Sequence, residues 1–305
     1  MSVFFTKVRK VFCHPDMVWD KFYHAILLIL IKDDERYVKW DYFLGMGKFP
    51  NLECPKTYNE KLCWLKLHAK NPAYSRMVDK YEAKEYVKSI VGEEYIIPSY
   101  GVWNKFEDID FDSIPNQFVL KTTHDSGWVI ICKNKETFNV KQAQSKVSDS
   151  YRKNLYLYHR EYPYKDVKPR IIIEKLMCDT KGQSLKDYKF FCFDGVVKML
   201  FVATDRPVDT RFDFFDRDFN HLPFRQGHPM ASKTIEKPEN FEEMVRIAEK
   251  LSKNIPHVRV DLYNIDGKIF FGELTFFHFG GTVPFKPGEW DSKIGEWLIL
   301  PPNNE

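Results

Sequence analysis

Paired cysteines are missing from this sequence. No C-x-x-C motif occurs, and the six cysteines are scattered at positions 13, 54, 63, 132, 178 and 192. Zinc sites usually contain such a pair, and disulfide frameworks are typical of small secreted domains. We therefore expect the thiols to be reduced and mostly buried.

Long hydrophobic runs are also missing. The apolar run at residues 25–31 is too short to span a bilayer, and charged residues follow it at 32–36. Lys7, Arg9 and Lys10 precede the run, but no small-residue cleavage site follows, which argues against a signal peptide. We expect a cytoplasmic protein whose N-terminal helix packs on the core, with contact to the inner membrane face as the alternative.

Charge of one sign is scarce, since the formal net charge is +3 over 305 residues. This balance does not demand nucleic acid, which we do not expect as a partner, and it does not exclude anionic ligands such as nucleotides or acidic sugars. The 44% of hydrophobic residues predicts a globular chain of one large or two ordinary domains. Aromatic residues reach 16%, which indicates a thick core or, alternatively, a carbohydrate-binding surface.

Apolar periodicity predicts helices at residues 16–31, from Thr57 onward, and at 73–90, 141–158 and 241–253. Thr57 is a candidate N-cap, and Glu60 stands at the capping-box position. Gly45 and Gly47 predict a turn-rich connection before this helix, and Gly92 predicts the end of the next one.

Short strand-like runs occupy residues 118–121, 129–132, 171–176, 188–193, 196–204, 258–263 and 268–275. The first two bracket a polar loop of small residues at 122–127, which predicts a mobile flap. Helices combined with antiparallel strand pairs predict an α+β fold in two lobes that meet near residues 178–187.

The C-terminal hairpin carries the strongest polar pattern. Arg259 and Asp261 alternate with apolar residues and therefore share one face of a strand, and Glu273 and Thr275 share a face of the next strand. We expect no lysine near the two carboxylates, so they would repel each other unless a cation lay between them. Mg²⁺ bridging a substrate's phosphates fits such oxygen ligands, with Arg259 stabilising a transferred phosphoryl group. An ordinary ladder of surface charges is the alternative.

Four further residues have a functional and an ordinary interpretation. Lys121 ends a strand before the small-residue loop and can bind phosphate, or it is simply a solvated charge. His124 lies in the loop itself, as a phosphate donor, a base or an ordinary loop residue. Lys189 lies among aromatic residues, where it needs a partner or an anionic ligand. Glu174 ends an isoleucine strand, where it can contact adenine or ribose, or where the strand simply reaches the surface.

The order of these features resembles the ATP-grasp superfamily, and within it the TupA-like branch linked to teichuronopeptide and other cell-surface polysaccharides. The phrases that carry the resemblance are YNEKLCWLKL (58–67), VDKY (78–81), IPSYGVW (97–103), DYKFFCFDG (187–195) and FGELT (271–275). The resemblance covers roughly residues 50–301. It implies an ATP-grasp fold, in which two α+β lobes with antiparallel sheets hold ATP between them.

The resemblance also implies a domain plan. A helical N-terminal extension would occupy residues 1–50, and a helical or linker part of the ATP-grasp unit residues 51–115. A small lobe with the phosphate flap would span 116–180, and a large lobe with the metal site would span 181–305.

The resemblance further assigns roles to individual residues. Those that would contact the nucleotide are Lys84, Lys121, His124, Ser126, Gly127, Glu174, Lys175, Leu176 and Lys189. Lys84 and Lys121 would contact phosphates, His124, Ser126 and Gly127 would form the flap, and residues 174–176 would meet adenine and ribose. Arg259 would be the transition-state arginine, and Asp261 and Glu273 would hold Mg²⁺.

Two positions depart from the family pattern. Thr275 stands where many ATP-grasp enzymes have Asn, and a neutral hydroxyl is a weaker metal ligand. Trp128 stands in the flap where a small residue is expected, which predicts altered flap closure, a cap over the site or stacking on a sugar.

The function implied is an ATP- and Mg²⁺-dependent carboxylate–amine ligase that acts through an acylphosphate in cell-surface polysaccharide synthesis. Its partners would be an acidic small molecule or glycan and an amine, with possible contact to polysaccharide-assembly enzymes. A kinase that shares the site is one alternative. A glycosyltransferase is another, with Asp213, Asp216 and Asp218 as its candidate acidic motif.

Overall fold

The computed structural model describes residues 27–179, 185–205 and 209–302. Most of the predicted N-terminal helix therefore lies outside the described residues, as does part of the predicted junction between the lobes at 178–187. The last turn of that N-terminal prediction is described, and residues 27–30 are helical. No helix in the described ranges is long and apolar enough to cross a membrane.

The described helices are α3 (Asp34–Met46), α4 (Tyr58–His68), α5 (Ala73–Val78), α6 (Glu82–Val91), α7 (Val140–Tyr151), α8 (Leu155–His159), α9 (Phe241–Leu251) and α10 (Glu289–Trp297). The strands are β1 (Ser99–Trp103), β2 (Phe118–Thr122), β3 (Ile130–Cys132), β4 (Ile171–Lys175), β5 (Asp187–Phe193), β6 (Val196–Thr204), β7 (Arg211–Asp216), β8 (Arg225–Gln226), β9 (Val258–Ile265), β10 (Lys268–Thr275) and β11 (Phe285–Lys286). A 3₁₀ segment, η5 (His278–Gly281), follows β10 and matters below.

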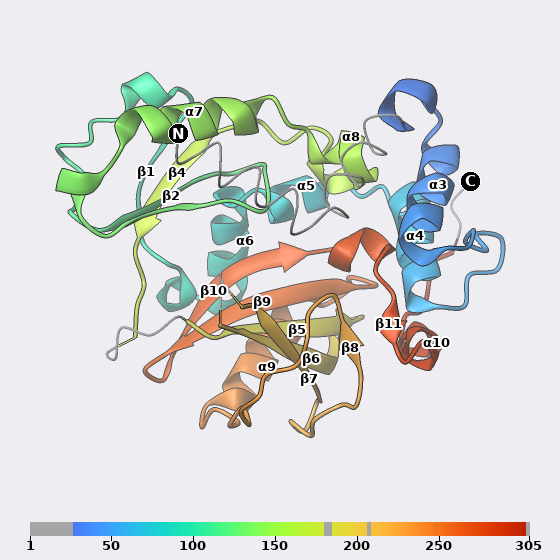
Figure 1. Ribbon diagram of the computed structural model, residues 1–305. Helices are drawn as coiled ribbons and strands as arrows, with labels where there is room; N and C mark the ends of the chain where they lie inside the picture. The colour runs from blue at the N-terminus through green and yellow to red at the C-terminus, as the bar shows by residue number, and fades with distance from the viewer. Residues whose placement is uncertain (1–26, 180–184, 206–208, 303–305) are drawn as a thin grey trace.

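Two antiparallel sheets organise the molecule. The first has the order β1-β4-β2-β3, and the second has the order β10-β9-β5-β6-β7. Figure 1 shows the first sheet under α7 and the second beside α9, with α5 and α6 lying between the two sheets. The mixed α+β architecture with antiparallel sheets agrees with the prediction, and β1 joins the first sheet from the stretch expected to be helical or linker.

Each sheet has its own hydrophobic core. The smaller core lies between the first sheet and α7, where Leu120 and Ile173 pack with Ala143 and Val147. The larger one surrounds the second sheet and takes in the buried faces of α4, α6 and α9. Phenylalanines fill much of this larger core, which agrees with the core interpretation of the aromatic content.

Local signals place several of these elements as predicted. Thr57 and Glu60 form a complete capping box at the start of α4, and Gly92 caps α6. All five described cysteines are free, and Cys63, Cys132 and Cys192 are buried.

The structure corrects the prediction at two places in the helical region. Gly45 lies inside α3 and does not mark a turn. A Cβ at this position would come within 2.1 Å of Thr282 O, so the glycine permits close packing of the helix against that residue. The single helix predicted over 73–90 is broken at Asp79, whose Oδ1 accepts hydrogen bonds from the N–H groups of Tyr81 and Glu82 at 2.8 and 2.9 Å.

Candidate active site

The β9–β10 hairpin brings the predicted carboxylates together through a β-bulge. Phe271 pairs with Leu262 on the core side, and the next pair is Glu273 with Asp261, so Gly272 is an extra residue on β10. Because successive side chains alternate between faces, this extra residue places Glu273 on the same face as Asp261. A Cβ on Gly272 would lie 3.1 Å from Asp261 O, which explains why glycine occupies the bulge.

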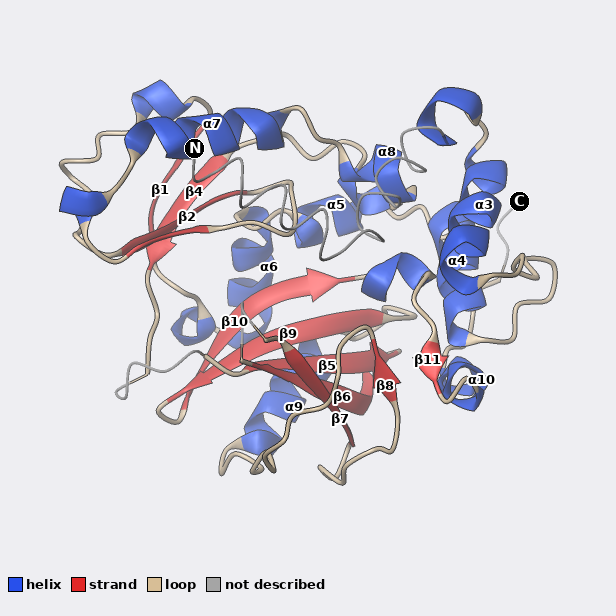
Figure 2. Cartoon of the chain, viewed as in Figure 1, coloured by secondary structure: helices blue, strands red, loops and turns tan. Residues whose placement is uncertain are grey.

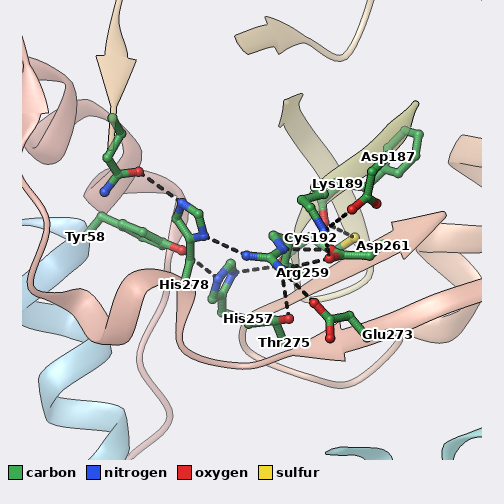
Figure 3. Close-up of polar contacts among 12 residues, drawn as sticks. Tyr58, Asp187, Lys189, Cys192, His257, Arg259, Asp261, Glu273, Thr275 and His278 are labelled. Carbon is green, nitrogen blue, oxygen red and sulfur yellow. Dashed lines mark hydrogen bonds and ion pairs between the residues drawn. The ribbon is translucent and has the colours of Figure 1, made fainter. Parts of the chain in front are cut away.

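Arg259 is the centre of the polar cluster on this face. Its Nε donates to Asp261 Oδ1 at 2.7 Å, and its Nη2 donates to Asp261 Oδ2 at 2.8 Å and to Thr275 Oγ1 at 3.0 Å. Nη2 also reaches Glu273 Oε1 at 3.3 Å, and Nη1 lies 2.7 Å from His278 Nδ1 (Figure 3). Burial lowers the pKa of Arg259, but Asp261 and Glu273 raise it by more, so the guanidinium stays charged.

A lysine does lie beside the carboxylates, which corrects the prediction. Lys189 on β5 is opposite Asp261 on β9, and its Nζ pairs with Asp261 Oδ2 and, at 2.7 Å, with Asp187 Oδ2 (Figure 3). The sequence does not reveal this neighbour, because the two strands are far apart along the chain. Burial raises the pKa of Asp261, but Arg259 and Lys189 lower it by more, so the carboxylate is ionised. Asp261 and Glu273 therefore stand side by side without needing Mg²⁺ between them.

The cluster nevertheless fits Mg²⁺ by its charge and its oxygen donors. Asp187, Asp261 and Glu273 contribute three carboxylates against the two cations Lys189 and Arg259. The Glu273 side chain is 46% exposed, so its oxygens are accessible. Mg²⁺ in proteins is commonly held by one or two carboxylates together with substrate phosphates. Among the described residues these carboxylates are not arranged so that three side chains could hold an ion by themselves, because both Asp261 oxygens are paired with Lys189 and Arg259, so such an ion would depend on the nucleotide for further ligands.

A second charged cluster forms in the first sheet. Glu174 on β4 is buried and pairs with Lys84 from α6 and with Lys121 from β2, the latter at 2.5 Å. Lys84 also donates to Ile97 O at 2.6 Å and to Ser99 Oγ at 2.7 Å. Burial raises the pKa of Glu174, but Lys121 and Lys84 lower it by more. Three residues that the sequence singled out separately are thus in one contact group.

The β2–β3 loop is anchored at its start and exposed at its tip. His124 is buried, and its Nε2 lies 3.1 Å from Ser150 O on α7, so its imidazole faces the helix. Asp125 Oδ2 accepts hydrogen bonds from Ser150 Oγ at 2.8 Å and from Trp128 Nε1 at 2.9 Å. Ser126 and Gly127 form the exposed tip, and Gly127 has φ +88°. The tip is available for a phosphate contact, whereas the indole of Trp128 is hydrogen-bonded to Asp125 within the same loop.

The two residues after Glu174 have only part of their hydrogen-bonding groups available for contact with an adenine base. The Lys175 N–H donates to Pro98 O at 2.9 Å, so this donor is already used, and the Lys175 side chain is exposed. Leu176 follows the strand and is half-buried.

Lys80 is a site residue that the sequence analysis missed, although it lies in the VDKY phrase. Its Nζ donates to Asp125 O in the loop base. Burial is the main cause that lowers its pKa to about 8; Glu273 raises the pKa, and Lys121 lowers it further. Charges from both polar clusters, Lys121 in one and Glu273 in the other, therefore influence the pKa of Lys80.

The acidic motif considered for a glycosyltransferase has structural partners. Asp213 Oδ2 accepts the N–H of Ala231 at 2.9 Å, and Asp216 accepts hydrogen bonds from the N–H groups of Asp218 and Asn220 at 2.9 and 2.8 Å. These contacts hold the β7 turn, and the glycosyltransferase alternative finds no support.

Comparison with known proteins identifies the family. A family model described as TupA-like ATPgrasp matches residues 60–299. No curated protein matches the chain.

Solved structures of ATP-grasp ligases are among those similar to this chain. A D-alanine–D-alanine ligase from Bacillus anthracis complexed with ATP is 18% identical, with 66% of this chain and 55% of that chain covered and a TM-score of 0.40. The ATP-grasp ligase PsnB, complexed with a phosphomimetic variant of its minimal precursor, Mg and ADP, is 12% identical, with 75% and 60% covered and a TM-score of 0.41. The chain spans little more than half the length of these structures. The assignment rests on the family model: the chain belongs to the TupA-like ATP-grasp family and has its α+β fold.

Proposed function

We propose that this protein is an ATP- and Mg²⁺-dependent carboxylate–amine ligase. A substrate carboxylate attacks the γ-phosphorus of ATP, which forms an acylphosphate and releases ADP. An amine then attacks the acyl carbon, the C–O bond to phosphate breaks, and an amide, inorganic phosphate and a proton result. Family membership supports the use of ATP, and the observation that carries the site assignment is the set of contacts that join buried Glu174 to Lys84 and Lys121, and Arg259 to Asp261 and Glu273.

The two clusters would divide the work on the nucleotide. Lys84 and Lys121 would bind phosphate oxygens. When no nucleotide is bound, Glu174 would hold both ammonium groups in place. The exposed tip at Ser126 and Gly127 would cover the phosphates from the first sheet. Residues 174–176 would contact adenine and ribose at the end of β4.

Arg259 and Lys189 would act at the phosphoryl group that is transferred. Arg259 is held by four partners, so its guanidinium is oriented before substrate binds, and that orientation lowers the cost of stabilising developing charge. Bound Mg²⁺, held by Asp261 and Glu273, would neutralise phosphate charge.

The biological setting is part of the proposal. The TupA-like branch is linked to cell-surface polysaccharides, so the acid would be a uronic acid unit or an amino acid and the product an aminoacylated glycan precursor. ATP is available in the cytoplasm, where the protein would work alone or against the inner membrane face.

The acylphosphate step is testable with hydroxylamine as the amine. The protein is incubated with ATP, Mg²⁺, hydroxylamine and D-galacturonate, L-glutamate or D-alanine, and hydroxamate and ADP are measured. We expect equal amounts of hydroxamate and ADP with at least one acid, and a loss of 10²-fold or more in Arg259→Met, the range found for removal of a transition-state donor.

Two results would redirect the proposal. ADP formation with a stable phosphorylated acid and no hydroxamate would indicate the kinase alternative. Absence of ADP formation with every acid, in a protein that binds no ATP, would contradict the ligase proposal altogether.

A further inference from the structure

A group of ionisable side chains outside the nucleotide site converges on Gly280. An added Cβ on Gly280 would lie 3.6 Å from Lys66 Nζ, 3.7 Å from His159 Nδ1 and 3.8 Å from Glu161 Oε1. Lys66 comes from α4, and His159 and Glu161 come from the end of α8 and the residues after it. We call these four residues the Gly280 cluster. Because glycine has no side chain, the position of its missing Cβ is the point on which the three ionisable groups converge.

Lys66 is the unusual member of the cluster. Its side chain is 0% exposed, and its Nζ makes no hydrogen bond with any described residue. Asp41 Oδ2 lies 3.8 Å away, which is an ion pair without a hydrogen bond. An ammonium has three donors, and burying them without acceptors is costly. Such a group is expected where a ligand supplies the acceptors.

The Gly280 cluster adjoins the candidate active site through one short segment. Segment η5 begins at His278, which contacts Arg259, and continues to Gly280. In Figure 2 this short helical turn after β10 extends toward α4, the helix that carries Lys66. The charges of Lys66 and Arg259 both lower the pKa of Glu161. A molecule lying along η5 would therefore reach Lys66 at one end and Arg259 at the other.

We propose that the Gly280 cluster binds an anionic group of the acid substrate, with Lys66 as its anchor, while the carboxylate to be activated lies beside Arg259. The acid substrate is then one that carries a second anionic group, such as a dicarboxylic amino acid or a glycan with two acidic groups. This inference rests on the proposed ligase function and deepens it, since it names the substrate class.

The charges around Lys66 are compatible with this role. Burial is the main cause that raises the pKa of Glu161, although Lys66 and His159 lower it, so a negative charge on Glu161 is less favoured here than in water. The His159 side chain is 39% exposed, whereas its Nδ1, the atom that faces the cluster, is buried.

The test compares acid binding with nucleotide binding in the same variants. Thermal unfolding is followed for the full chain with Mg²⁺ and a non-hydrolysable ATP analogue, with added L-glutamate, citrate or D-galacturonate. We expect at least one dianionic or trianionic acid to raise Tm in the wild type, and Lys66→Met to weaken its binding at least tenfold. Lys66→Arg, which keeps the charge, should retain part of it.

Two matched controls separate ligand binding from folding. Lys70→Met removes an exposed lysine just beyond α4 and should change nothing. Gly280→Ala places a methyl group into the cluster and should weaken acid binding, whereas Gly47→Ala carries comparable backbone strain at φ +71° with no atom within 4 Å and should not.

The outcomes distinguish this inference from the ligase proposal. Normal Mg²⁺-dependent analogue binding, with acid binding that is equal in Lys66→Met and wild type, would overturn the inference alone. So would the failure of all the added acids to shift Tm in a wild type that binds the analogue. Loss of analogue binding in the wild type itself would instead contradict the proposed function.

Discussion

At the scale of single residues, paired charges define the site. Glu174 is nearly fully buried between two lysine side chains, and Asp261 lies between Arg259 and Lys189. Removing a buried carboxylate that is flanked by two cations is costly, because it leaves uncompensated charge. The lysines are therefore paired with carboxylates in the absence of a nucleotide, where the proposed function would have them bind phosphate.

Glu174→Gln tests this arrangement through stability. The variant leaves Lys84 and Lys121 close together without a carboxylate, so we expect a loss of about 3–5 kcal/mol in the free energy of unfolding at pH 7. Chemical denaturation measures it. Glu53→Gln, at an exposed position, should change stability by less than about 0.5 kcal/mol.

The pH dependence of the same variant has a defined sign. The pKa of folded Glu174 lies below its ordinary value of 4.5, so the stability it contributes is full above pH 4.5 and is lost as pH falls through the folded pKa. The difference between wild type and Glu174→Gln should therefore shrink as pH is lowered from 6 toward 3. A difference that stays constant across this range would show that the pKa of Glu174 is the same in the folded and unfolded protein, which would contradict the lowered pKa.

At the scale of elements, short-range signals were readable from the sequence and long-range pairings were not. The capping box at Thr57, the glycine stop at Gly92 and the β9–β10 hairpin depend on residues a few positions apart, and all three were predicted. The Lys189–Asp261 pair depends on the register of β5 against β9, and the role of Gly45 depends on its approach to Thr282. Neither contact leaves a local pattern.

The candidate site shows the same division between residues that the sequence reveals locally and residues whose neighbours come from distant segments. The sequence singled out Lys84, Lys121, Glu174, Arg259, Asp261 and Glu273, which the structure collects in two clusters. It did not single out Lys80, or Lys66 of the proposed acid-binding cluster, because a lysine within a helical phrase or after one looks like an ordinary surface charge. Their burial and surroundings come from distant segments, the 278–281 region for Lys66 and the β2–β3 loop for Lys80.

Thr57→Ala tests the local signal at the start of α4. Thr57 Oγ1 accepts the Glu60 N–H at 3.3 Å, and Glu60 Oε2 accepts the Thr57 N–H at 3.1 Å. We expect a loss of about 1 kcal/mol in the free energy of unfolding. Thr234→Ala, at an exposed position, is the control and should be close to neutral. An equal, small effect in both variants would mean that the cap does not stabilise the helix in the folded chain.

At the scale of the whole molecule, the proposed site draws on both sheets. One cluster lies on the β1-β4-β2-β3 sheet and the other on the β10-β9-β5-β6-β7 sheet. Lys80 donates a hydrogen bond to Asp125 O in the β2–β3 loop of the first sheet, and Glu273 on the second sheet raises the pKa of Lys80. Binding a nucleotide between the sheets should therefore stabilise both together. Removing either cluster should weaken binding of the same ligand.

Calorimetry of ATP binding, with and without Mg²⁺, tests this central claim most directly. The wild type is compared with Asp261→Asn/Glu273→Gln on the second sheet and with Lys121→Met on the first. The account predicts Mg²⁺-dependent ATP binding that is lost in the double variant and weakened about tenfold or more in Lys121→Met. ATP binding that is independent of Mg²⁺ and unchanged in both variants would contradict it.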